Sequence, residues 1–170
     1  GSLTGNPRGP QPDAFCNRFA AVAAGMAHLG RCGHAVHPRF GSNWRSLSIV
    51  TDAPLAVSPA LAEADRPHCD GCMRCLDACP VGAFRPAVTV PVAGTAQTFH
   101  PVDRRRCDWA KRFSLVVAAG TGLLGWKLDL RPPERIGAEE LTTALRQLPG
   151  IERHRPCNAE SCVLACPHSR

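Results

Sequence analysis

The sequence contains no long apolar run, although 44% of its residues are hydrophobic. Its longest apolar stretch, from Leu115 to Trp126, is interrupted by three glycines and a threonine. That stretch is too short to span a bilayer. The chain also does not open with a charged segment followed by an apolar one, so we expect no secretory signal peptide. These absences predict a protein that does not insert into a membrane.

Short motifs of several enzyme classes are also missing. The sequence has no H-E-x-x-H zinc motif, no P-loop and no G-x-S-x-G nucleophile elbow. The C-x3-C-x2-C pattern of radical-initiating enzymes is absent, and so is tyrosine. His34 and His37 flank a glycine-rich loop without a nearby carboxylate, which favours a structural or cofactor-lining role. No constellation in the sequence therefore predicts catalytic residues.

Cysteine is plentiful, with ten residues, and four of them form one regular run. The run is C-x2-C-x2-C-x3-C followed by Pro80, with cysteines at Cys69, Cys72, Cys75 and Cys79. This is the bacterial ferredoxin spacing, in which thiolates hold a [4Fe–4S] cluster. The alternatives are a zinc knuckle or a disulfide knot, but zinc sites usually pair two separated C-x2-C elements. Cysteines clustered in this spacing predict a reducing compartment, most simply the cytoplasm.

A second cysteine set is less regular and ends in Cys166-Pro167. Two clusters would account for all eight cysteines in the two sets, whereas one cluster leaves three unexplained. In ferredoxins with two clusters, the fourth cysteine of each run ligates the other cluster. This crossing rule predicts a first cluster held by Cys69, Cys72, Cys75 and Cys166, and a second held by Cys79, Cys107, Cys157 and Cys162.

Local patterns predict helices and short strands around these cysteines. Helical periodicity is expected from Asp13 to about His28, over Val102–Ala119 with Asp103 as the cap, and over Ala138–Leu148. Strands are expected at Trp44–Thr51, 87–93 and 96–100. The predicted fold class is α+β: residues 1–12 are a linker or tag, 13–66 contain a helix, a glycine-rich loop and a strand, and 67–170 form a ferredoxin-like dicluster region with a long insertion.

Several segments ahead of the cysteine run resemble corrinoid-dependent reductive dehalogenases and, more loosely, the related epoxyqueuosine reductases. These segments are Ala24–Gly33, His37–Gly41, Arg45 and Thr51–Leu55. The resemblance implies that residues 13–66 are the remnant of a nitroreductase-like corrinoid-binding domain. It also implies that cobalamin binds, with Gly30, Arg31, Gly33, His37, Pro38 and Gly41 as a corrinoid-facing loop.

The resemblance also bears on the second cluster. The family takes one ligand from an Asp-x-x-x-Cys segment, which is similar to Asp103–Cys107 here. Between Cys157 and Cys162, however, this chain has four intervening residues where the family more often has two. A three-iron cluster, or a histidine ligand such as His154 or His168, is therefore an alternative to the all-cysteine second cluster.

Together these patterns predict an electron-transfer protein with two [4Fe–4S] clusters, similar to the electron-delivery module of a cobalamin-dependent reductase. The family's catalytic residues are not in this chain, so a catalytic domain or subunit, or a ferredoxin- or flavodoxin-type redox partner, is expected. The alternatives are a free-standing ferredoxin-like subunit without corrinoid and a tRNA-acting protein similar to epoxyqueuosine reductase. The net charge of +6 and the Arg104–Arg106 run favour nucleic acid only weakly.

Overall fold

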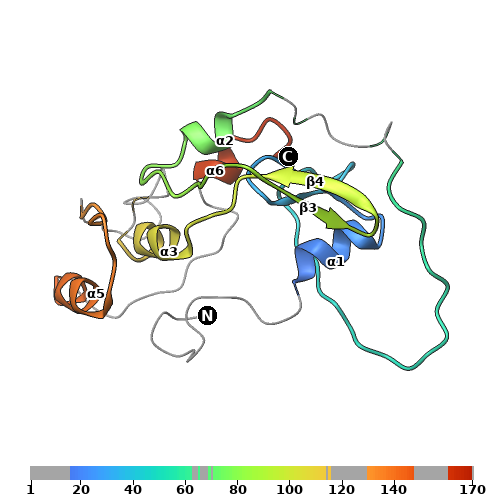
Figure 1. Cartoon of the computed structure of the whole chain (residues 1–170), viewed down its shortest axis with the longest axis horizontal. Coiled ribbons are helices and arrows are strands. Elements are labelled where there is room, and N and C mark those ends of the chain that lie inside the picture. Colours follow the sequence, from blue (N-terminus) through green and yellow to red (C-terminus); the bar gives the residue numbers. More distant parts are fainter. Residues whose placement is uncertain are drawn as a thin grey trace.

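The computed structural model describes residues 16–62, 65, 69, 71–113, 115, 130–147 and 161–169. Short helices and two antiparallel hairpins make up this part of the chain (Figure 1). The mixture confirms the α+β class. No helix within the described ranges is long and apolar enough to cross a membrane. The nitroreductase-like remnant and the domain limits remain predictions.

The first helix, α1 (Asn17–Ala23), packs beside a hairpin of β1 (His28–Leu29) and β2 (Ala35–Val36). The expected start at Asp13 lies outside the described residues, and the expected end near His28 is wrong. The helix stops because Gly25 has a φ of +68°, a left-handed conformation typical of helix ends. A side chain there would overlap the carbonyl of Pro59, so only glycine fits.

The hairpin expected over 87–93 and 96–100 is confirmed. It consists of β3 (Val88–Val92) and β4 (Thr95–Phe99), with Val92 paired to Thr95 across a two-residue turn. Both turn residues have positive φ, +47° at Ala93 and +78° at Gly94, which matches the twist of a tight hairpin.

A small apolar cluster joins this hairpin to the N-terminal helix. Val22 of α1, Leu29 of β1 and Phe99 of β4 are buried against one another. The ring of Phe19 lies 6.0 Å from that of Phe99, between centroids. Residues on both sides of the predicted boundary at 66/67 therefore share one core.

The strand expected at Trp44–Thr51 is wrong. The segment is irregular and forms part of a wide loop that leaves the helices (Figure 1). Its alternating apolar residues are exposed, with 84% of Leu47 and 82% of Ile49 accessible. Alternation predicts a strand only where a partner strand can pair with it, and the described residues place none there.

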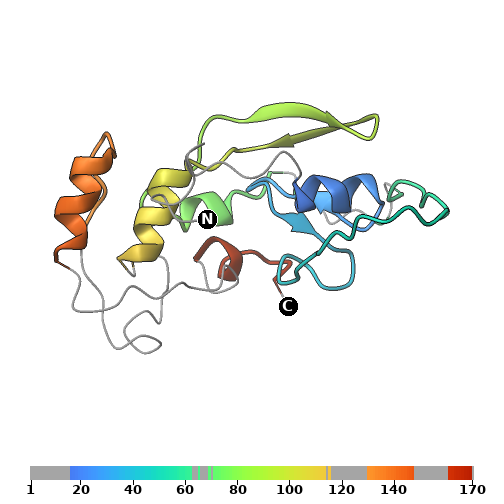
Figure 2. The same cartoon turned by 90° about the horizontal axis from the view of Figure 1, so that it is seen from below.

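The larger core lies between α3 (Arg104–Arg112) and α5 (Ala138–Leu145), which stand side by side in Figure 2. Trp109 and Phe113 are fully buried with ring centroids 4.9 Å apart, and the indole N–H of Trp109 donates to the Leu130 carbonyl at 2.7 Å. Helix α3 is capped by Asp103 as expected and ends before Phe113. The expected continuation of this helix to Ala119 is wrong, because Phe113 and Leu115 lie outside the helix. Helix α5 begins at Ala138 as expected and ends at Leu145, short of the expected Leu148, which lies outside the described residues.

Two one-turn helices carry cysteines and pack against each other. They are α2 (Arg74–Asp77) and α6 (Ser161–Leu164), almost ninety residues apart in sequence. The chain after α6 is fixed to the loop after β2: Gly41 and Ser169 form an antiparallel bridge, and the Ser42 amide donates to the His168 carbonyl at 3.0 Å. These contacts join the end of the described chain to the loop that follows β2.

The contact at Gly41 predicts a severe effect of an added methyl group. Gly41 has a φ of +64°, and a Cβ there would overlap the His168 carbonyl oxygen. We expect Gly41→Ala to lower the free energy of unfolding by clearly more than the ~1–2 kcal/mol of a left-handed alanine alone. Gly94→Ala is the matched control, because Gly94 also has positive φ but a Cβ there meets nothing within 4 Å. Denaturant titrations of both variants check this, and equal losses would contradict it.

The Asp103 cap gives a second prediction. Its carboxylate accepts from the amides of Arg105 at 3.0 Å and Arg106 at 3.2 Å, and it also pairs with Arg85. We expect Asp103→Ala to cost about 1 kcal/mol of stability through the lost cap. Asp103→Asn should cost less, because the amide oxygen still caps and the lost ion pair involves a 63% exposed arginine side chain. Thermal unfolding of the two variants makes the comparison, and an equal loss in both would refute the cap as the cause.

Candidate iron–sulfur site

The regular cysteine run forms a loop that leads into helix α2. Gly71 supplies a left-handed turn with a φ of +72°, Cys75 lies on α2, and Cys79 follows the C-cap residue Ala78 of that helix. Cys75 is buried at 5% exposure, whereas Cys69, Cys72 and Cys79 are half-buried. The cysteines of the run are thus at least partly shielded from solvent.

The thiols that we assigned to the first cluster influence one another electrostatically. Burial raises the pKa of Cys69, and the nearby thiols of Cys75, Cys166 and Cys72 raise it further, while the Arg31 amide lowers it. Cys166 comes from the far end of the chain, as the crossing rule expects. The ligand set itself stays a prediction.

Within the described residues, no three His, Cys, Asp or Glu side chains are arranged to bind one metal ion. The thiolates around an iron–sulfur cube bind different irons, so they stand farther apart than the ligands of a single ion. The donor set, thiols from one ferredoxin-type run and from Cys166-Pro167, has the chemistry that a [4Fe–4S] cluster requires. The residues therefore fit this cofactor chemically.

Backbone amides reach two of the predicted ligand sulfurs. The Arg31 N–H donates to Cys69 Sγ at 3.2 Å, and the Ala83 N–H donates to Cys79 Sγ at 3.3 Å. Hydrogen bonds of this kind stabilise a thiolate and help to set the potential of an iron–sulfur cluster. The Arg31 contact brings the glycine-rich loop to the first cysteine of the run, which the spacing of the motif did not foresee.

The sequence did not predict that Cys32 would lie beside a cysteine of the ferredoxin-type run. This thiol is 5% exposed and lies close to the thiol of Cys75. The contact with Cys32 lowers the pKa of Cys75 to about 7. The same contact, together with burial, raises the pKa of Cys32. No motif includes Cys32, so only its folded position reveals the contact.

The second cysteine set is described in part. Cys79 and Cys107, the latter on α3, both pack at the edge of the core between α3 and α5. Cys162 lies on α6, and its electrostatic interaction with Cys32 raises the pKa of Cys32. Cys157 and the alternative ligand His154 lie outside the described residues. The structure therefore brings Cys79 and Cys107 to one core, and the remaining assignment stays a prediction.

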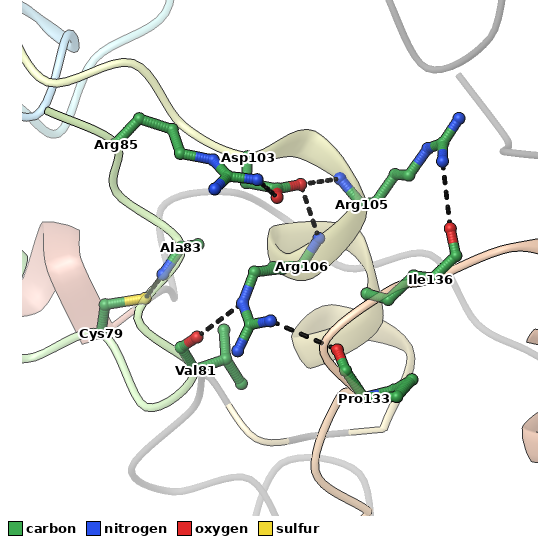
Figure 3. A network of polar contacts seen from close by, with 9 residues as sticks. All are labelled: Cys79, Val81, Ala83, Arg85, Asp103, Arg105, Arg106, Pro133 and Ile136. Atoms are coloured by element: carbon green, nitrogen blue, oxygen red, sulfur yellow. Dashed lines mark hydrogen bonds and ion pairs between the residues drawn. The ribbon is translucent and has the colours of Figure 1, made fainter. Parts of the chain in front are cut away.

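Arginines of α3 connect this helix to the loop after Cys79 and to residues 133–136, which precede α5 (Figure 3). Arg106, which precedes Cys107, donates from Nε to the Val81 carbonyl at 3.0 Å and from Nη1 to the Pro133 carbonyl at 3.3 Å. Arg105 donates to the Ile136 carbonyl at 3.1 Å. The run expected as a nucleic-acid signal thus serves internal contacts at two of its three positions.

The faces of the loop predicted to meet a corrinoid are turned toward protein atoms. A Cβ on Gly30 would lie 3.0 Å from a methyl of Val36 and 3.6 Å from Cys69 Sγ, and one on Gly33 would lie 2.8 Å from the Phe99 ring. Gly41 faces the His168 backbone, as described above. These contacts leave no cradle for a corrinoid at the three glycines.

The other residues of that loop have local roles or lie at the surface. The Nδ1 atom of His37 accepts from the amides of Arg39 at 3.0 Å and Phe40 at 3.3 Å, and its ring packs against Trp44. Pro38 is exposed. The corrinoid-facing role of the loop stays a prediction. The described contacts of these residues are explained by the protein itself.

Comparison with known proteins adds a family match and two relatives. The model of the 4Fe-4S binding domain family matches residues 63–85, which hold the regular cysteine run. The chain is 33% identical over 89 residues to an epoxyqueuosine reductase from a Synechococcus species, covering 52% of this chain and 26% of the relative. It is 36% identical over 64 residues to the Pseudomonas aeruginosa epoxyqueuosine reductase, covering 38% and 17%.

No solved structure gives a significant match. The chain spans about a quarter or less of the length of these curated relatives. The matches therefore support an iron–sulfur protein related to epoxyqueuosine reductases over part of its length, with a 4Fe-4S binding domain at 63–85.

Proposed function

We propose that this chain is an electron-transfer unit with two [4Fe–4S] clusters that serves a reductase similar to epoxyqueuosine reductase. The observation that carries the proposal is the packing of α2, which holds Cys75, against α6, which lies just before Cys166. Segments far apart in sequence must come together in this way if two ferredoxin-type ligand sets are crossed. The pKa of Cys69, which the nearby thiols of Cys75, Cys166 and Cys72 raise, supports the same arrangement.

Each bound cluster would supply one-electron transfer. The residues of the chain hold and tune that chemistry. Cys69 and Cys79 would bind iron while accepting amide hydrogen bonds from Arg31 and Ala83. The Arg106 contacts would keep Cys107 beside the loop that follows Cys79.

The reaction is proposed from the relatives. Both are epoxyqueuosine reductases, and a reduction requires electrons that clusters can deliver. Cobalamin is not part of the proposed steps, because the glycine faces of the predicted loop are filled by protein. The wider likeness to reductive dehalogenases stays a prediction.

The partner that we propose is the catalytic part of such a reductase. The loop over 44–57 carries apolar side chains exposed to 72% or more, at Leu47, Ile49, Val50, Leu55 and Val57. Exposed apolar residues gathered in one segment are typical of surfaces that another protein covers. Because the chain spans about a quarter or less of its relatives, the remainder of a longer reductase is the partner that this surface suits.

A free-standing ferredoxin-like carrier is the second candidate. The feature that favours it is the bridge between Gly41 and Ser169, which joins the chain after Cys166 to the loop after β2 within this chain. A nucleic-acid role has weaker support, because Arg105 and Arg106 bond to backbone carbonyls of the protein itself.

The two-cluster proposal predicts a specific loss of iron in a paired variant. Purified under anaerobic conditions, the wild-type chain should bind about eight irons and eight sulfides, as two [4Fe–4S] clusters require. Cys79→Ser combined with Cys107→Ser should bind about four irons, because only the second cluster loses ligands. Iron and sulfide assays with EPR of the dithionite-reduced protein measure both quantities.

Cys16→Ser is the control for this experiment, because Cys16 precedes α1 and belongs to neither predicted ligand set. It should retain about eight irons. If the wild type binds about four irons and the paired variant binds the same number, the second cluster does not exist. Complete loss of iron in the paired variant would show that the crossing assignment is wrong.

A further inference from the structure

Ser42 is a buried serine in the loop after β2, and the proposed function leaves it without a role. Its side chain is 8% exposed, and its Oγ makes no hydrogen bond within the part of the chain that the structure describes. A buried hydroxyl without a partner is costly, so such groups in folded proteins usually face a bound ion, cofactor or water. The hydroxyl of Ser42 therefore has a proton to donate to a bound group.

The backbone around Ser42 lies against the turn that follows Cys166. The Ser42 amide donates to the His168 carbonyl at 3.0 Å, and Gly41 forms an antiparallel bridge with Ser169. The Ser169 amide in turn donates to the Cys166 carbonyl at 2.9 Å. Ser42 is thus held against a short turn that begins at a predicted ligand of the first cluster.

The hairpin that leads into this loop contacts another predicted ligand of the same cluster. The Arg31 amide, between β1 and β2, donates to Cys69 Sγ at 3.2 Å. A Cβ on Gly30 would lie 3.6 Å from that sulfur. The hairpin and the loop after it therefore adjoin Cys69 on one side and the turn after Cys166 on the other, and Ser42 is buried in this region.

The chemistry of the predicted cofactor matches a hydroxyl donor. The sulfur atoms of an iron–sulfur cluster accept hydrogen bonds, and these bonds help to set its potential. A serine hydroxyl carries one proton to donate and needs no change of ionisation to do so. A donor offsets the negative charge that the cluster gains on reduction, so it favours the reduced state and raises the reduction potential.

We propose that Ser42 contacts the first cluster: its hydroxyl donates a hydrogen bond to an inorganic sulfide of the cluster and raises the reduction potential without binding iron. Because the hydroxyl bonds to no described thiol, Cys166 included, the sulfide is the acceptor that suits it. The inference deepens the proposed function and rests on a cluster held in part by Cys69 and Cys166. It does not require the second cluster.

Electron–nuclear double resonance of the dithionite-reduced protein, together with redox titration, tests the proposal. The wild type should show a coupling to a proton that exchanges in D2O, and Ser42→Ala should lose it. The midpoint potential of the first cluster should fall in Ser42→Ala while the iron content stays that of the wild type. Ser48→Ala is the matched control, because Ser48 is exposed, and it should change none of these quantities.

A second background assigns the effect to one cluster. The paired variant Cys79→Ser, Cys107→Ser should hold only the first cluster, so adding Ser42→Ala to it should still remove the proton coupling. Persistence of the coupling in this background, with its loss in the wild-type background, would place Ser42 at the other cluster and overturn the inference.

The remaining outcomes are equally distinct. An unchanged coupling and potential in Ser42→Ala would mean that the hydroxyl bonds to a buried water or to nothing. Loss of iron in Ser42→Ala but not in Ser48→Ala would make the serine necessary for assembly of the site, not a donor that tunes the potential. A wild type with about four irons would refute the two-cluster function while still allowing this test, and a wild type without iron would refute both.

Discussion

The structure depends on one constraint: partly or fully buried thiols from segments far apart in sequence lie close to one another. Thiols packed together repel one another once ionised, and each loses water on burial. At Cys69 this appears as a raised pKa, caused first by burial and then by three neighbouring thiols. Positive iron relieves that cost when a cluster binds, so ligand binding and folding should be coupled.

Much of the polypeptide serves to hold these sulfurs in position. The turn between β1 and β2 approaches Cys69 and Cys75, the loop after Cys79 turns its Ala83 amide back to that sulfur, and Gly41 lets the chain after Cys166 lie against the loop. Two of these contacts are made by backbone amides, and at Gly41 a Cβ would overlap the His168 carbonyl oxygen. The glycine-rich loop thus has a structural purpose within the described residues.

The arginines of α3 fix the neighbouring segments in a similar way, through hydrogen bonds to backbone carbonyls. Arg106 bonds to one carbonyl of the loop after Cys79 and to another at Pro133, so it ties two segments to the helix that carries Cys107 (Figure 3). Arg112 is also buried and pairs with Asp108 at 2.6 Å. The Arg104–Arg106 run, which the sequence suggests is a surface feature, therefore also makes hydrogen bonds within the protein.

The sequence by itself determined the local features: the ferredoxin spacing, the Asp103 cap, the α3 face with Trp109 and Phe113, and the hairpin of β3 and β4. Each depends on residues close together in the chain, so local periodicity and turn chemistry suffice. Only the tertiary structure decided that Trp44–Thr51 is not a strand, that α1 ends at Ala23, and that Cys32 meets Cys75. These features depend on residues far away in the sequence. A strand needs a partner strand, the chain at Gly25 lies against Pro59, and Cys32 is buried by other segments. No local pattern encodes such packing.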